Sequence, residues 1–101
     1  MAASIDWSSD KNAELKLRYG FGFERVLVAL AEDGFLDERA HPNAARYGHQ
    51  RQLVVDIDGY VWIVPFVAEG ERVFLKTMFP SRKATRDYLG GESGTRKSNE
   101  S

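Results

Sequence analysis

The sequence of 101 residues has no cysteine, only two histidines and only three prolines. The absence of cysteine excludes disulfide bonds, thiolate zinc sites and cysteine nucleophiles, and it fits a reducing cytoplasm. The two histidines, His41 and His49, do not form an HxxH or HxxxH pair, so we expect no metal site. No GxGxxG, Walker, GxSxG or paired-carboxylate pattern stands out, and we expect no cofactor.

Long hydrophobic runs are missing as well. The longest, residues 60–68 (YVWIVPFVA), is too short to span a bilayer and contains a proline. The N-terminal residues carry charge and lack the apolar stretch of a signal peptide. We therefore expect a cytoplasmic protein without membrane contact.

The chain also lacks a strong net charge, since its formal charge at pH 7 is −1. Any binding of nucleic acid must then depend on where the cations are placed. Between residues 72 and 89 there is one acid, Asp87, and a cluster of bases: Arg72, Lys76, Arg82, Lys83 and Arg86. A nearly neutral protein therefore has one basic end.

The length and a hydrophobic fraction of 43% are typical of one globular domain. We expect this domain to cover residues 1–89. Residues 90–101 (GGESGTRKSNES) are polar and rich in glycine and serine, which predicts a disordered tail.

The first half of the sequence predicts a short edge strand followed by two helices. Residues 4–7 form the strand, and Ser8 or Ser9 caps a helix that ends near Gly20. The second helix lies within residues 21–33, and Gly34 is expected to end it in the left-handed conformation. Residues 35–51 show no sustained period and predict a long loop, with one helical turn near residues 43–46.

The second half predicts a three-stranded antiparallel meander over residues 52–57, 60–67 and 72–79, with turns at Asp58-Gly59 and Glu69-Gly70. The first face of the meander should pack on the two helices. It holds Leu53, Val55, Ile57, Tyr60, Trp62, Val64, Phe66, Val73, Leu75, Thr77 and Phe79. The second face is mixed and holds Val54, Asp56, Val61, Ile63, Pro65, Val67, Arg72, Phe74, Lys76 and Met78. A final helix follows Pro80, which suits the first turn of a helix, and the predicted fold class is α+β.

The cations at the start of this last helix have two interpretations of about equal weight. They line a solvated helix face, or they bind a phosphate at the strand-to-helix junction. His49 likewise is either a loop histidine that makes hydrogen bonds or a general acid or base near the sheet.

Three segments resemble a known family, and together they span residues 5–89. They are "IDWSSDKN", "YGFGFERV" and, above all, "PSRKATRDYL". Their order resembles the BrnT group of toxins, in the RelE/ParE superfamily of type II toxin–antitoxin systems. The sequence departs from the family at Ser8, where an aspartate is usual, at Gly22, where a serine is usual, and at Asp87 and Tyr88, where Arg-Glu is frequent.

The resemblance implies a metal-independent endoribonuclease that cleaves mRNA by attack of the 2′-hydroxyl and is neutralised by a cognate antitoxin in a hetero-oligomer. Arg82 and Lys83 match the family signature and would clamp the phosphate. Lys76 would neutralise charge or act as a base, and His49 or Tyr88 would transfer protons. Further phosphate contacts are expected from Ser81, Arg86 and Arg72.

Two alternatives remain open. The superfamily includes members that inhibit gyrase or lack activity, so a non-catalytic protein-binding module is one of them. Its partner would bind the second sheet face at Ile63, Val67, Phe74 and Met78. The other is a metal-dependent hydrolase built on His41, His49 and Asp56.

Overall fold

The N-terminal strand and the two helices form within the predicted ranges, and the predicted caps hold for the first helix. The computed structural model describes residues 4–46 and 48–90, with β1 at Ser4–Trp7, α1 at Ser9–Tyr19 and α2 at Phe23–Ala31. The side chain of Ser8 accepts a hydrogen bond from a backbone N–H in the first turn of α1. Gly20, with φ +88°, ends that helix.

Gly34 has a different role from the predicted one. The left-handed residue after α2 is Asp33, with φ +65°. A Cβ on Gly34 would lie 2.7 Å from the carbonyl oxygens of both Ala29 and Asp56. Glycine is therefore needed because α2 and the sheet approach the backbone here, and the Asp56 N–H donates to the Gly34 carbonyl over 2.8 Å.

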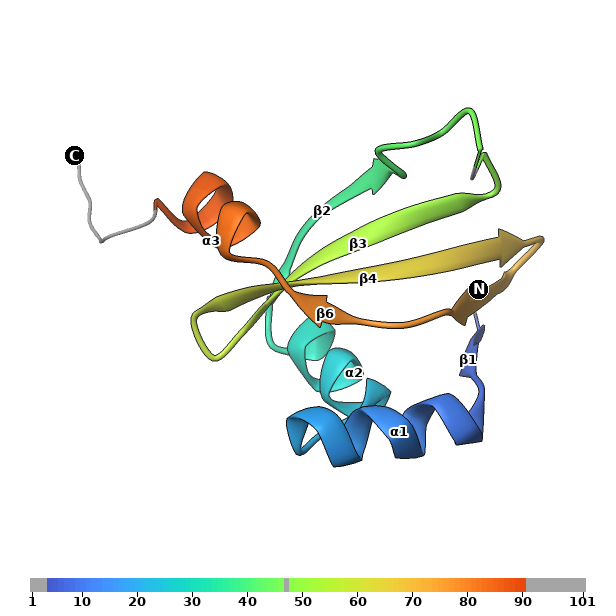
Figure 1. The fold of residues 1–101 in the computed structure, drawn as a ribbon, viewed down its shortest axis with the longest axis horizontal. Coiled ribbons are helices and arrows are strands. Elements are labelled where there is room, and N and C mark those ends of the chain that lie inside the picture. The colour runs from blue at the N-terminus through green and yellow to red at the C-terminus, as the bar shows by residue number, and fades with distance from the viewer. Residues whose placement is uncertain (1–3, 47, 91–101) are drawn as a thin grey trace.

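The remaining elements build one mixed sheet and a C-terminal helix (Figure 1). Their bounds are β2 Phe35–Ala40, β3 Gln50–Ile57, β4 Tyr60–Glu69, β5 Arg72–Leu75, β6 Phe79–Pro80 and α3 Arg82–Leu89. The strand order is β1-β5-β4-β3-β2, and β6 also pairs with β4. β1 runs parallel to β5, and the other pairs are antiparallel. The predicted α+β class is confirmed.

The prediction of a loop over residues 35–51 is wrong at both ends, because β2 covers its first six residues and β3 already begins at Gln50. β2 pairs with β3 from Phe35 to Ala40, with an irregularity between Phe35 and Asp37. In the rest of the segment, the Arg46 N–H donates to the Asn43 carbonyl over 3.1 Å, which closes a turn without forming a helix.

The meander has its first turn where predicted, because Ile57 pairs with Tyr60 across Asp58-Gly59. The second turn lies one residue later than predicted, since Glu69 pairs with Arg72.

The third predicted strand, residues 72–79, breaks at Leu75. The Lys76 N–H donates to the Pro65 carbonyl over 2.8 Å, but proline has no N–H with which to return the bond. The chain therefore leaves β4, and Met78 turns into the core under the first sheet face instead of lying on the second face. Pro80 also differs from prediction, because it lies in β6 and Ser81 caps α3.

Each sheet face has its own core. The first face packs on α1 and α2, as predicted, through Leu15, Phe23, Val26, Ala29, Val55, Ile57, Trp62, Val64, Phe66, Leu75 and Met78. On the second face, Ala84 of α3 packs with Val54, Val61 and Ile63. Figure 1 shows α1 and α2 together and α3 apart from them.

The C-terminal tail predicted at residues 90–101 lies outside the described residues, except for Gly90, which ends α3 with φ +84°. Within residues 4–46 and 48–90, no helix is long and apolar enough to cross a membrane.

Candidate functional site

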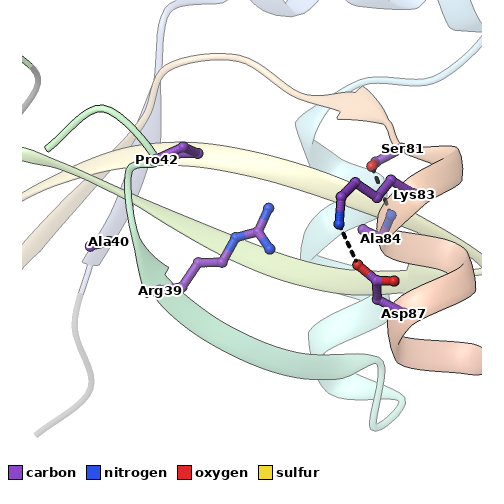
Figure 2. Close-up of a pocket in the computed structure, with 7 residues that line it drawn as sticks. All are labelled: Arg39, Ala40, Pro42, Ser81, Lys83, Ala84 and Asp87. Carbon is purple, nitrogen blue, oxygen red and sulfur yellow. Dashed lines mark hydrogen bonds and ion pairs between the residues drawn. The ribbon is translucent and has the colours of Figure 1, made fainter.

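A pocket of about 360 Å³ lies between β2 and α3. It is lined by Arg39, Ala40, Pro42, Ser81, Lys83, Ala84 and Asp87. Figure 2 shows that the side chains of Arg39 and Lys83 reach into it from opposite sides. The predicted basic helix therefore has a cation facing it from a strand that the sequence did not predict.

Arg39 is held in place by a buried amide. Its Nε donates to Oε1 of Gln52 over 2.9 Å, and Gln52, directly opposite on β3, is only 4% exposed. A buried partner restricts the guanidinium to one direction, which is the direction of α3 in Figure 2. The sequence interpretation missed Arg39 because it lay inside the predicted loop. The sequence signal that could have indicated it is the spacing of Asp37 and Arg39, two residues apart, which places both side chains on one face if the segment is a strand.

Lys83 is paired with an acid of its own helix. Its Nζ lies 2.9 Å from Oδ2 of Asp87, one turn further along α3. This hydrogen bond is the main cause of a lowered Asp87 pKa, and the charges of Lys83, Arg86 and Arg39 act in the same direction. The carboxylate is thus negatively charged at neutral pH and lies under the influence of both pocket cations.

Ser81 lines the pocket and also caps the helix. Its Oγ accepts from the Ala84 N–H over 3.0 Å, and its carbonyl accepts from the Thr85 hydroxyl over 2.7 Å. A hydroxyl that accepts a hydrogen bond still has its own hydrogen to donate, so Ser81 remains able to contact an anion.

Arg82 and Arg86 do not line the pocket. Both are exposed on α3, and neither is among the residues around the cavity. The structure therefore separates Lys83 from the two arginines with which the sequence grouped it.

Tyr88 lies on the buried side of α3. Its hydroxyl donates to Oδ2 of Asp37 over 2.6 Å. This hydrogen bond is the main cause of a raised Tyr88 pKa and of a lowered Asp37 pKa. Tyr88 is consequently protonated at neutral pH with its hydroxyl engaged, and it is outside the pocket lining. These features disfavour the predicted role in proton transfer.

His49 lies away from the α3 pocket. It is exposed just before β3 and lines a different cavity with Gly48, Arg51, Val67, Ala68 and Glu69. The structure therefore does not place His49 in the pocket with Lys83, and its role as an acid or base remains a prediction. The other histidine, His41, accepts a hydrogen bond at Nδ1 from the Asn43 N–H over 2.9 Å, as expected of a loop histidine.

Lys76 and Arg72 lie on the same sheet face as Arg39 but further from α3. They line a cavity of about 210 Å³ with Val67, Glu69 and Phe74. The Lys76 ammonium lies 5.5 Å from the centre of the Phe74 ring, and Arg72 pairs with Asp6 at 3.3 Å.

One row of residues joins the two cavities across the sheet. Arg39 pairs with Gln52, Gln52 pairs with Pro65, and the Lys76 N–H bonds to Pro65. Arg39 and Lys76 thus stand at the two ends of the row, three strand spacings or roughly 14 Å apart.

The four predicted partner-binding residues separate into two pairs. Ile63 and Met78 are each only 1% exposed, Ile63 under α3 and Met78 in the core under α1 and α2. Their prediction as contact residues is wrong, because neither reaches the surface. Val67 and Phe74 are half-buried and line the smaller cavity, so they remain accessible.

The predicted metal-dependent hydrolase has no assembled ligand set. Among residues 4–46 and 48–90, no three His, Cys, Asp or Glu side chains are grouped in a way that could hold a metal ion. Asp56 instead accepts a hydrogen bond from the Gly59 N–H over 2.8 Å, which is a role in the hairpin turn.

No protein-family model, curated protein or solved structure matches the chain. Similarity therefore assigns it to no family, and its function has to be inferred from the chemistry and placement of its residues.

Proposed function

We propose that the chain is the toxin of a type II toxin–antitoxin system, a metal-independent endoribonuclease that cleaves mRNA and is neutralised by a cognate antitoxin. The observation that carries this proposal is the pocket between β2 and α3, where Arg39 and Lys83 face one another beside the exposed Arg82 and Arg86. Cations from two elements around one cavity suit a phosphate group. The resemblance of residues 5–89 to BrnT-like toxins favours RNA as its source.

The chemistry requires the ribose 2′-hydroxyl to attack the adjacent phosphorus. The hydroxyl loses its proton as the new P–O bond forms, and the leaving 5′-oxygen gains a proton as its bond breaks. Negative charge builds on the two non-bridging oxygens meanwhile, and nearby cations stabilise it. Arg39 and Lys83 are placed to supply this stabilisation, and Lys76 lies at the other end of the same row.

Growth after induced expression tests the proposal, with total RNA examined at the same time. Wild type is expected to arrest growth and degrade RNA, whereas an Arg82→Ala/Lys83→Ala variant does neither. A Lys11→Ala/Lys16→Ala variant removes the same charge from α1, on the other side of the sheet, and should remain toxic. Growth unaffected by wild type would contradict the proposal.

A second candidate is a non-catalytic protein-binding module of the same fold, either an inactive toxin or an inhibitor of another target. It is favoured by Val67 and Phe74, which are half-buried on a part of the second sheet face that α3 does not cover. Arg72 and Lys76 beside them suit an acidic partner segment.

Purified protein distinguishes the two candidates. A module of this kind co-purifies with the product of the neighbouring gene and does not cleave RNA, even with ribosomes present. A Val67→Lys substitution would then abolish the complex, because it places a charge in the apolar contact. Cleavage by the free protein contradicts this second candidate.

A further inference from the structure

The pocket between β2 and α3 already contains an anion of the protein's own. Asp87 lines the cavity, and its carboxylate lies 2.9 Å from the Lys83 ammonium. Arg39 is near enough to contribute to the lowered pKa of the same carboxylate. In Figure 2 the guanidinium of Arg39 points from β2 toward Lys83 and Asp87.

We propose that Arg39 and Lys83, rather than Arg82 and Arg86, hold a phosphodiester of single-stranded RNA in this pocket, and that the carboxylate of Asp87 fills the phosphate's place in the free protein. This inference rests on the proposed function. It names the residues that bind the phosphate, and it identifies Asp87 as a group of the protein that competes with the phosphate.

Arg39 is the fixed member of the clamp. Its Nε is used by Gln52, which is 4% exposed, so the direction of the guanidinium is set from inside the protein. The guanidinium points into the pocket in Figure 2, and two parallel N–H donors match two phosphate oxygens. The Arg39 side chain also hydrogen-bonds to the Tyr88 hydroxyl, where it opposes the rise in the Tyr88 pKa.

Lys83 is the exchangeable member. Its side chain is 77% exposed and that of Asp87 is 48% exposed. Solvent-exposed pairs one helical turn apart are weak, so the lysine can leave the carboxylate for a phosphate at small cost. Asp87 would then lower the affinity for RNA without preventing binding.

Equilibrium binding of a short, fully 2′-O-methylated oligoribonucleotide at low salt tests this assignment. The methyl groups block attack by the 2′-oxygen, so binding is measured without cleavage. Asp87→Asn is expected to tighten binding by about two- to five-fold, the effect of releasing one exposed pair. Glu14→Gln is the control, because it loses the same charge and releases the exposed cations Arg18 and Lys11 on α1, on the other side of the sheet.

Measuring the effect of Asp87→Asn on binding in two double variants shows which cations it depends on. In an Arg39→Gln/Lys83→Met variant the gain from Asp87→Asn should fall to that of Glu14→Gln, since no clamp is left to release. In an Arg82→Gln/Arg86→Gln variant, which also lacks two cations, the gain should persist in full. Circular dichroism of each variant establishes that it is folded.

Three outcomes would overturn the inference. If Asp87→Asn gains no more than Glu14→Gln, or if its gain survives loss of Arg39 and Lys83, the phosphate lies elsewhere. The proposed function would still stand, provided that wild type binds the oligonucleotide and arrests growth. If neither wild type nor Asp87→Asn binds, and wild type causes no arrest, both the inference and the proposed function fail.

Discussion

The hydroxyl of Tyr88 on α3 donates a 2.6 Å hydrogen bond to Asp37 on β2. This contact joins the C-terminal helix to β2, which within residues 4–46 and 48–90 is an edge strand paired with β3 alone. Both partners lie on the second sheet face, next to the core formed by Val54, Ile63 and Ala84. The wall of the pocket that carries Arg39 is thereby tied to the wall that carries Lys83.

Tyr88→Phe removes this bond and is expected to lower the melting temperature. The difference from wild type should be constant between roughly pH 5 and pH 9. Since the Asp37 pKa is lowered in the folded state, its contribution is present at higher pH and is lost as the pH falls through that pKa. Since the Tyr88 pKa is raised, its contribution is present at lower pH and is lost as the pH rises through that pKa.

Thermal unfolding across the pH range measures the effect. The two melting curves should converge at both acidic and alkaline pH. A difference that remains unchanged at both extremes would show that the hydroxyl stabilises the fold independently of the charge on Asp37.

Gly34→Ala should be among the most destabilising single substitutions. The added Cβ would lie 2.7 Å from two backbone carbonyl oxygens, which cannot move without separating α2 from β3. We expect a loss of about 3 kcal/mol in the free energy of unfolding. Gly20→Ala is the control, because its Cβ meets nothing within 4 Å and only the positive φ costs about 1 kcal/mol. Urea denaturation that ranks the two in the opposite order would contradict this explanation.

Asn12 connects α1 to the start of α2. It is 7% exposed, its Oδ1 accepts from the Phe23 N–H over 2.7 Å and its Nδ2 donates to Glu24 over 2.9 Å. Asn12→Ala leaves a buried N–H unsatisfied and should cost about 2 kcal/mol of unfolding free energy. Asn43→Ala, at an exposed turn position, should be nearly neutral. Equal effects in chemical denaturation would argue against the capping role.

Met78 and Val67 were assigned the same role by the sequence, and the structure predicts different behaviour. Met78→Ala should cost about 3 kcal/mol, because it opens a cavity in the core under α1 and α2. Val67→Ala should cost at most about 1 kcal/mol, since its side chain is half-buried at the edge of a cavity. Calorimetry of both variants checks this, and a stable Met78→Ala would contradict the core assignment.

The helices and the first hairpin were predictable because their signals are local. Ser8 and Gly20 mark the two ends of α1, and Asp58-Gly59 suits a two-residue turn. The break after Leu75 was not predictable from strand alternation. It depends on Pro65, which is distant in sequence and which cannot return the hydrogen bond of Lys76.

β2 was missed because its sequence, FLDERA, has little strand preference of its own. Side-chain contacts with β3 compensate for this low strand preference. Arg39 bonds to Gln52, and Arg51 pairs with Glu38 at 2.6 Å. The sequence therefore predicted the side of the candidate site on α3 and missed the side on β2. Its α3 residues follow from a local motif, while Arg39 depends on a pairing that only the folded chain shows.

The parallel pairing of β1 with β5 has a consequence for how the protein is made. Ser4 pairs with Arg72, 68 positions later, so β1 leaves the ribosome well before its partner strand β5. Until then β1, whose Trp7 ring packs 5.5 Å from the centre of the Phe23 ring, is not joined to β4 through β5. Closing so long a loop is slow compared with forming the helices. A chain whose translation stops before Arg72 would lack both the partner of β1 and the whole of α3, so truncated products could form neither the complete sheet nor the basic pocket.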